Sequence, residues 1–430
     1  MARVAARAST PAPAAARSRP ASGRRIEEDV LLTAVLCLVA FGAVMVYSAS
    51  SATTVVKGGG DGTGFLIKYL VYGLAGFVCL RIASRWPLQK VLSLTGPFLA
   101  FAFTCLVLVE VPGLGVSVNG ATRWLGAGPL TFQPSEVAKL ALVLYAARFL
   151  AERPRALRSP KDLMPLGLVA GTAVLLVATQ PDLGTALVVS FTMATMMIAA
   201  GVPMRWLAGF AAAGSVLVMM YAMTAPYRRA RLTSFLDPWS HAGDAGFQAV
   251  QGQIAIGSGG LFGRGLGESV QKIFYLPEAH TDFILAIIGE EVGLLGIFGL
   301  ILLYGTFAWA GLRIAQQAKG RYAALLAAGV TSLVLCQALL NLWAVLGIAP
   351  LTGVPLPFIS YGSTNLVVLL VACGLLVNVA RGGSVHLRAI NGGRDAPRST
   401  ADGAADVRDR SGGDGGARRA GAGDRRRAAG

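Results

Sequence analysis

The chain has 430 residues, of which 54% are hydrophobic and only 14% are charged, and its mean hydropathy is +0.60. Soluble proteins carry roughly 25% charged residues, so this composition excludes a disordered protein and argues against a soluble enzyme. The 54 glycines and 20 prolines follow no Gly-X-Y period, which excludes a collagen-like fibre. The composition therefore predicts a multi-spanning membrane protein.

The net charge of +16 is concentrated at the two ends of the chain. Six arginines precede the first apolar run, and eleven lie from Arg381 onward. No aromatic residues are interleaved with them, so we expect these arginines to set topology and contact anionic lipid rather than bind nucleic acid. Residues 1–25 and 383–430 are predicted to be disordered tails on either side of a membrane domain at 26–382.

Roughly 20 apolar residues are needed for a helix to cross a bilayer. The chain then contains about ten candidate spans, so the predicted fold is an all-α polytopic membrane protein. The first apolar run has no cleavage site behind it and indicates an uncleaved anchor. The distribution of Lys and Arg places both termini in the cytoplasm. In chain order, the spans are 30–50, 65–83, 91–111, 137–150, 163–179, 183–201, 206–224, 283–310, 322–346 and 366–380.

Two predicted outer segments are long, 112–136 and 225–281, and the second separates the seventh and eighth spans. Loops of more than about 12–15 residues without structure of their own are usually functional. Within the second loop, the apolar stretch 247–256 indicates a re-entrant or interfacial helix, and the run 257–267 a glycine-rich turn. That run lacks the lysine and the strand-loop-helix setting of a P-loop, so it does not predict a nucleotide site.

Asp282 opens the eighth apolar run at its outer end. It is either a helix N-cap or a partly desolvated carboxylate that accepts a proton. Glu290 and Glu291 follow inside the same predicted span, where a charge is unfavourable. We therefore expect at least one of them to face a polar interior, or both to pair with basic groups near the cytoplasmic side.

Arg123 and Lys139 are cations on the predicted outer side, which opposes the positive-inside trend. Together they can hold a diphosphate, Arg by its planar fork and Lys as a point charge. The alternative is that Glu136 and Lys139 form an i,i+3 pair while Arg123 contacts lipid phosphates.

Two further polar segments have an ordinary structural explanation. Gln180 and Asp182 lie in a short reversal that reads as a turn followed by an N-cap, and the loop 350–364, which contains Ser360, is stiffened by prolines. Five cysteines without CxxC spacing and three scattered histidines predict no metal site, and no cofactor is evident. Composition and spacing leave a transporter, a channel and a lipid-substrate enzyme open.

Six segments together resemble the SEDS family of bacterial cell-wall proteins, whose members include FtsW and RodA. They occur in the family's order over about residues 30–380. One departure is Ser363, where the family usually has a second glycine, which changes the backbone freedom of that loop. The segments are 44–50, 120–124 with 133–139, 180–185, 257–267, 277–293 and 350–362.

The resemblance implies an inverting peptidoglycan glycosyltransferase that uses lipid II, a disaccharide-pentapeptide on undecaprenyl diphosphate. The family's essential aspartate aligns with Asp282, and Arg123 and Lys139, or a divalent cation (Mg or Mn), would stabilise the diphosphate. The substrate-binding residues implied in this way are Arg123, Gln133, Ser135, Glu136, Lys139, Gln180, Asp182, Gly265, Glu278, His280 and Ser360.

The resemblance also implies a setting: the bacterial cytoplasmic membrane at the division septum, with a class B penicillin-binding protein and other division proteins as partners. Segments 45–50 and 277–282 are more similar to the division enzyme FtsW than to the elongation enzyme RodA. A RodA-like polymerase and a lipid II flippase are the alternatives, and a scaffold that only recruits division proteins is a third class.

Overall fold

The structure is a computed structural model. It describes residues 22–56, 60–118, 121–127, 130–154, 157, 159–223, 233–244, 246–273, 275–276 and 279–385. Residues 1–21 and 386–430, which make up most of the two predicted tails, lie outside the described residues, and so does Glu278. The predicted disorder of the tails therefore stays a prediction.

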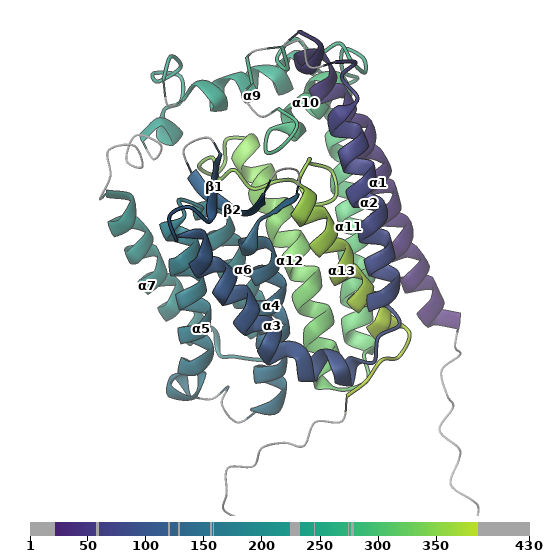
Figure 1. Ribbon diagram of the computed structural model, residues 1–430, viewed down its shortest axis with the longest axis vertical. Helices are drawn as coiled ribbons and strands as arrows, with labels where there is room; N and C mark the ends of the chain where they lie inside the picture. Colours follow the sequence, from purple (N-terminus) through teal and green to yellow (C-terminus); the bar gives the residue numbers. More distant parts are fainter. Residues whose placement is uncertain are drawn as a thin grey trace, which may run out of the picture. The chain divides into compact units, whose positions relative to one another are not determined.

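Helices dominate the described chain, and one small sheet interrupts them (Figure 1). Pro134 and Pro160 each occupy a first helical turn, where a missing backbone N–H costs nothing. In chain order the elements are α1 (Ser22–Val56), α2 (Gly64–Ala83), α3 (Leu88–Val109), β1 (Gly115–Val118), β2 (Ala121–Ala127), β3 (Leu130–Phe132), α4 (Pro134–Glu152), α5 (Pro160–Thr179), α6 (Leu183–Ala200), α7 (Met204–Met223), α9 (Phe247–Gly259), α10 (Ile284–Glu291), α11 (Gly293–Gln317), α12 (Arg321–Val345) and α13 (Ser363–Ala380).

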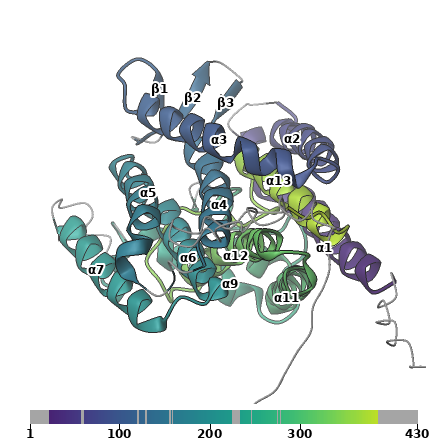
Figure 2. The same cartoon turned by 90° about the horizontal axis from the view of Figure 1, so that it is seen from below.

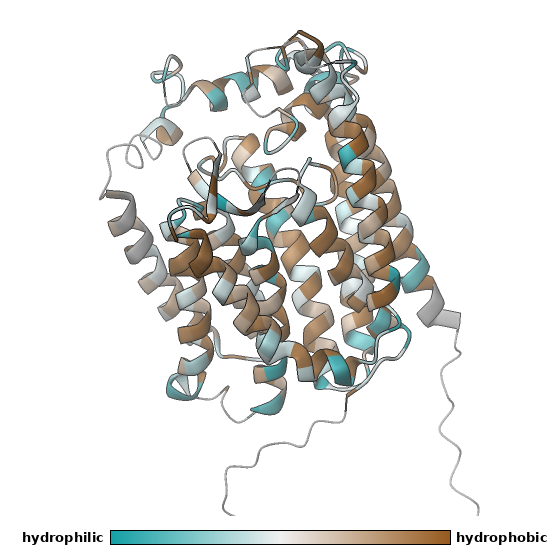
Figure 3. Cartoon of the chain, viewed as in Figure 1, coloured by the Kyte–Doolittle hydropathy of each residue, from teal (hydrophilic) through white to brown (hydrophobic). Residues whose placement is uncertain are grey.

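The protein is an all-α polytopic membrane protein. Eight of its described helices are long and apolar enough to cross a bilayer, namely α1, α2, α3, α5, α6, α11, α12 and α13. Figure 3 shows apolar residues along these helices. The fourth and seventh predicted spans correspond to α4 and α7. Helices α4 and α13 extend outward beyond the predicted apolar runs, to Pro134 and Ser363. The exact number of spans stays a prediction.

Helix α12 lies at the centre of the packing and contacts α4, α6, α11 and α13 (Figure 2). Most of its residues are buried, as are most of those of α4, whereas α7 touches little but α6. Glycines allow a close approach between α2 and α13: a Cβ at Gly374 would lie 2.5 Å from the Leu80 carbonyl oxygen. Small residues are the usual means of close helix packing in a membrane.

The predicted span 283–310 is wrong, because two helices replace it. Helix α10 ends at Glu291, and α11 begins at Gly293, whose φ of +76° a right-handed helix cannot contain. A Cβ at Gly293 would also lie 2.6 Å from the Leu261 carbonyl oxygen, so another segment of the chain occupies the corner. Glu290 and Glu291 therefore belong to a short helix outside the membrane-crossing part of α11.

The first long loop, 112–136, folds into an antiparallel sheet of order β1-β2-β3. Val116 pairs with Trp124, and Leu125 pairs with Phe132. Leu125 is buried with Cys105 and Val109, which anchors the sheet on the end of α3. Figure 1 shows the sheet at the same end of the helices as α9 and α10. Helix α9 confirms the helix predicted at 247–256.

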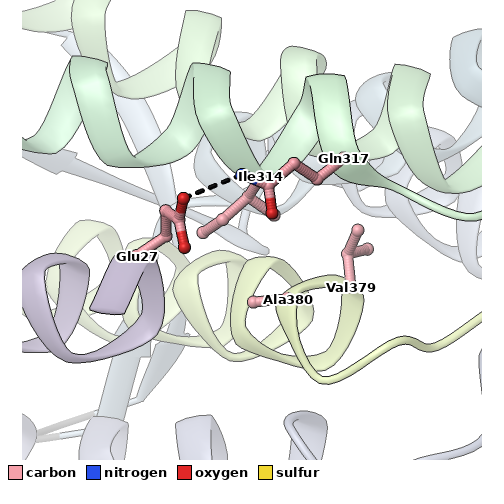
Figure 4. A pocket seen from close by; sticks show the side chains of 5 residues that line it. All are labelled: Glu27, Ile314, Gln317, Val379 and Ala380. Atoms are coloured by element: carbon pink, nitrogen blue, oxygen red, sulfur yellow. Dashed lines mark hydrogen bonds between the residues drawn. The ribbon is translucent and has the colours of Figure 1, made fainter. Parts of the chain in front are cut away.

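The first and last helices meet at the opposite end of the bundle. Arg381 pairs with Glu28 at 2.5 Å, and Gln317 donates a hydrogen bond to Glu27 at 2.8 Å. These contacts agree with an even number of spans, while the cytoplasmic position of both termini stays a prediction. A small pocket in this region is lined by Glu27, Ile314, Gln317, Val379 and Ala380 (Figure 4).

Candidate functional site

Asp282 lies in the turn that leads into α10, and its side chain is partly exposed. The N-cap position of α10 is Phe283, so the interpretation of Asp282 as the helix cap is wrong. The hydroxyl of Thr281 donates to the Asp282 carboxylate at 3.1 Å. From α12, the side-chain amide of Asn341 donates to the Asp282 backbone carbonyl at 2.8 Å. The turn is thus held through its backbone carbonyl, and Asp282 as a residue is only partly buried.

The segment 350–362 packs directly against this turn. A Cβ at Gly353 would lie 3.8 Å from Oδ2 of Asp282, so the glycine leaves room beside the carboxylate. Asn341 also donates to the carbonyl of Val354 at 2.7 Å. Ser360, a predicted substrate-binding residue, is buried, and its hydroxyl accepts a hydrogen bond from the Leu356 amide at 2.8 Å.

His280, two residues before Asp282, packs against two aromatic side chains. Its ring centroid lies 4.4 Å from that of Phe65 on α2 and 5.7 Å from that of Tyr361. The amide of Tyr361 donates to the His280 carbonyl at 2.9 Å. Burial raises the pKa of the Tyr361 hydroxyl above its usual value, so this hydroxyl keeps its proton at neutral pH. His280, Phe65 and Tyr361 therefore form one aromatic cluster at the segment that carries Asp282.

Glu136 and Lys139 form a second polar cluster inside the helices. The Lys139 ammonium lies 2.8 Å from the Glu136 carboxylate and donates to Gln337 of α12 at 2.8 Å. Both charged side chains are at most 2% exposed. The i,i+3 pairing expected as the alternative is therefore confirmed. Ser135 is buried beside them, and its hydroxyl has no hydrogen-bond partner among the described residues.

Arg123 holds the reversal before α6. Its Nε donates to the carbonyl of Gln180 at 3.0 Å, and its Nη2 donates to the carbonyl of Pro181. Asp182 caps α6 by accepting from the Thr185 amide at 3.1 Å, which confirms the predicted turn and N-cap. The other Asp182 oxygen accepts from the Gln133 side chain at 3.3 Å. Gln180 itself donates to the Leu106 carbonyl at 2.9 Å.

Helix α12 and the segment 350–362 connect the turn that carries Asp282 to the cluster of Glu136 and Lys139. Gln337 and Asn341 lie one turn apart on α12, and Gln337 donates to the carbonyl of Pro355 at 2.9 Å. At Gly184, a Cβ would collide with the carbonyl of Thr352, so α6 also abuts this segment. The sequence did not single out either amide, because polar residues within an apolar span carry no signal of their partners.

Gly265 lies apart from these clusters, in the glycine-rich loop. Its φ is +111°, and its amide donates to the carbonyl of Glu291 at 3.0 Å. Glu290 pairs with Arg264 of that loop, and Glu291 pairs with Lys272, which follows the loop in the chain. They do not pair with basic groups near the cytoplasmic side, as the sequence-based alternative held. Sequence reasoning missed Lys272, which no motif singled out.

In the part of the chain that the structure describes, no group of three or more His, Cys, Asp or Glu side chains is arranged to hold a metal ion. Asp282, Asp182 and Glu136 each sit in a different local cluster, and Glu136 is already neutralised by Lys139. These residues therefore do not by themselves fit a resident divalent cation.

The fold and the site define a multi-pass membrane protein with a partly exposed carboxylate in a polar cluster at one end of its helices. Residues 29–384 match the model of the FtsW, RodA and SpoVE family, described as cell cycle proteins. The chain belongs to this family.

Relatives with known names cover most of the chain. The "Probable peptidoglycan glycosyltransferase FtsW" of Thioalkalivibrio sulfidiphilus is 42% identical over 375 residues, which is 85% of this chain and 93% of that protein. The "Stage V sporulation protein E" of Bacillus subtilis is 37% identical over 360 residues, 83% of this chain and 98% of the relative.

Solved structures agree with this assignment. A chain from the structure described as "Structural coordination of polymerization and crosslinking by a peptidoglycan synthase complex" has a TM-score of 0.69 and 31% identity, over 82% of this chain and 96% of that one. The rod shape determining protein RodA of Thermus thermophilus has a TM-score of 0.60 and 29% identity, with 82% and 95% covered.

Proposed function

We propose that the chain is a peptidoglycan glycosyltransferase of cell division that polymerises lipid II on the outer face of the cytoplasmic membrane. The relatives with this activity in their names support the reaction, and the FtsW relatives support the division role over the elongation role. The observation that carries the assignment to a site is Asp282, a partly buried acidic residue whose carboxylate lies beside Gly353 in a turn held by Asn341.

Asp282 acts as the general base of an inverting transfer. Its carboxylate accepts the proton of the acceptor sugar's 4-hydroxyl while that oxygen attacks the anomeric carbon of the donor. The bond from the anomeric carbon to the lipid diphosphate breaks, and the diphosphate leaves with the electron pair. Fixing the turn through Asn341 keeps the base in place for this step.

Arg123 and Lys139 stabilise the charge that develops on the leaving diphosphate. Arg123 uses Nε and Nη2 for backbone carbonyls, and a guanidinium has further N–H donors for a phosphate oxygen. The Lys139 ammonium is held by Glu136 and Gln337. We therefore propose that its positive charge stabilises the diphosphate electrostatically, without a direct hydrogen bond.

The remaining residues of the polar clusters bind or frame the substrate. His280 lies near the sugar beside Asp282, and Glu278, which lies outside the described residues, precedes it in the chain. Ser360 shapes the loop under the carboxylate. Gly265 belongs to the glycine-rich loop, which it connects to the end of α10. The residues that line the diphosphate side of the site are Gln133, Ser135, Glu136, Gln180 and Asp182.

The proposed partner is a class B penicillin-binding protein, which would crosslink the strands that this chain polymerises. The similar solved structure is described as one in which a peptidoglycan synthase complex coordinates polymerisation and crosslinking, and this supports such a pairing. Other division proteins at the septum complete the proposed setting.

The direct test is glycan-chain formation by the purified protein with its partner and lipid II in detergent. A polymerase forms chains there, whereas flipping has no meaning without a bilayer. We expect chains from the wild-type protein, and their absence under conditions where the partner is active would contradict the proposal. Running the assay with a chelator and then with Mg²⁺ or Mn²⁺ tests whether an ion carried by the diphosphate is needed.

A further inference from the structure

Glu291 ends α10 in a buried ionic cluster that the proposed reaction does not use. Its carboxylate lies 2.8 Å from the Lys272 ammonium and accepts one hydrogen bond from the Ser48 hydroxyl of α1, shared between its oxygens at 2.7 and 2.6 Å. Lys272 also donates to the Gly267 carbonyl at 2.8 Å and to the Ser48 hydroxyl at 3.2 Å. The Lys272 and Glu291 side chains are at most 2% exposed. Three segments distant in sequence thus meet at one carboxylate.

Glu290 links the same end of α10 to the glycine-rich loop 257–267 and to the residues that follow it. Its carboxylate accepts from the Ser269 hydroxyl at 2.5 Å and from the amides of Val270 and Gln271 at 3.1 and 3.3 Å. Arg264 donates its amide to the Glu290 carbonyl at 2.9 Å. Because the last carbonyls of a helix have no partner within the helix, the loop satisfies groups that would otherwise be left unpaired.

Helix α10 is a short rod with Asp282 just before one end and this cluster at the other. Its eight residues span about 12 Å at 1.5 Å per residue. The chain turns at Gly293, whose φ is +76°, so α11 does not continue the rod. Helix α10 is buried along its length against α9 and α11, and hydrogen bonds hold its two ends, one near Asn341 and the other at Lys272 and Ser48.

We propose that Glu291, Lys272 and Ser48 are positioning residues that fix α10 and thereby the Asp282 carboxylate. A buried ion pair contributes little net stability, because desolvating its charges offsets their attraction. The directional hydrogen bond from the Ser48 hydroxyl of α1 to Glu291 instead specifies where the end of α10 lies. This inference rests on the proposed catalytic role of Asp282.

The test compares Lys272→Met/Glu291→Gln with wild type in the glycan-chain assay, at a temperature where both proteins are folded. The double variant removes both charges together and so avoids an unpaired buried charge. We expect kcat to fall about ten- to a hundredfold with KM within about twofold, because misplacing a reacting group by about 1 Å costs on the order of a hundredfold. The matched control, Glu28→Gln/Arg381→Met, removes an ion pair at the opposite end and should retain the wild-type kcat.

A second measurement reports the position of residue 282 without catalysis. Asp282→Cys is labelled with a maleimide in a background where Cys37 and Cys79 are replaced by alanine, since the other cysteines are buried. We expect the labelling rate to change when Lys272→Met/Glu291→Gln is added. The proposal requires both the fall in kcat and the changed labelling, and the absence of either overturns it. If Asp282→Asn forms glycan chains, the proposed catalytic role of Asp282 fails, whereas the labelling comparison still reports whether the cluster positions residue 282.

Discussion

The side chain of Asn341 donates one hydrogen bond to the backbone carbonyl of Asp282, at 2.8 Å, and a second to that of Val354, at 2.7 Å. One amide on α12 therefore connects the turn that carries the carboxylate to the segment beneath it. Such a bridge holds two irregular segments in register without using the carboxylate itself.

Replacing this amide should loosen the turn. We expect Asn341→Leu to leave two carbonyls unpaired and to destabilise the protein by about 1–3 kcal/mol for each that stays buried. Polymerisation should fall as well, because the turn carries the base. Thermal unfolding in detergent and the glycan-chain assay measure the two effects. The control is Leu339→Ala on the same helix, where the side chain is exposed toward lipid. Equal behaviour of the two variants would refute the bridge.

Variants of the Glu136–Lys139 pair distinguish a role in stability from a role in the reaction. Lys139→Met alone leaves a buried carboxylate uncompensated, which typically costs 3–5 kcal/mol, so we expect a loss on the order of 3 kcal/mol in unfolding free energy. Glu136→Gln/Lys139→Met should recover most of that stability. If Lys139 also stabilises the diphosphate, the double variant stays inactive although it is folded. An active double variant would reduce Lys139 to a structural role.

Arg123→Lys tests the role of the Arg123 guanidinium, which donates hydrogen bonds to two backbone carbonyls. A lysine cannot donate to the carbonyls of Gln180 and Pro181 and also reach a phosphate. We expect kcat/KM for lipid II to fall about ten- to a hundredfold, as for the loss of a charged hydrogen bond worth about 1.5–3 kcal/mol. Arg148→Lys, at a residue that contacts Glu152 at 2.9 Å, is the control. Wild-type kinetics in the Arg123→Lys protein would remove Arg123 from the site.

Two glycines of α11 offer a matched comparison. Gly293 has φ +76° and abuts the glycine-rich loop, whereas a Cβ at Gly299 would meet open space. We expect Gly293→Ala to destabilise the protein by at least about 1 kcal/mol and Gly299→Ala to be neutral or to stabilise it by up to about 1 kcal/mol. Unfolding midpoints measure both. Similar midpoints would mean that the corner between α10 and α11 tolerates a side chain.

The comparison of these glycines also explains what the sequence could and could not predict. Hydropathy located the helices because burial in lipid demands long apolar runs. It merged α10 with α11, since apolar runs lie on both sides of the short segment 289–293 and a positive φ leaves no trace in hydropathy. The sheet in the loop 112–136 was missed because its three strands are short and irregular.

The candidate residues were easier to find than their partners. Asp182 as a cap and Glu136 with Lys139 as a pair follow from local spacing, so sequence predicts them. The bonds from Ser48 to Glu291 and from Asn341 to Asp282 join residues far apart in the chain, and no local pattern encodes them. The role of Asp282 itself came from family resemblance, because local physics favoured a cap.

The central claim is that the Asp282 carboxylate takes the proton of the attacking hydroxyl. The most direct measurement is glycan-chain formation from lipid II by purified Asp282→Asn protein with its partner, beside wild type at equal folded concentration. The amide keeps the size of the side chain and removes its basicity, so we predict no polymer, with an unfolding midpoint close to that of the wild type. Wild-type chain formation by Asp282→Asn would contradict the account.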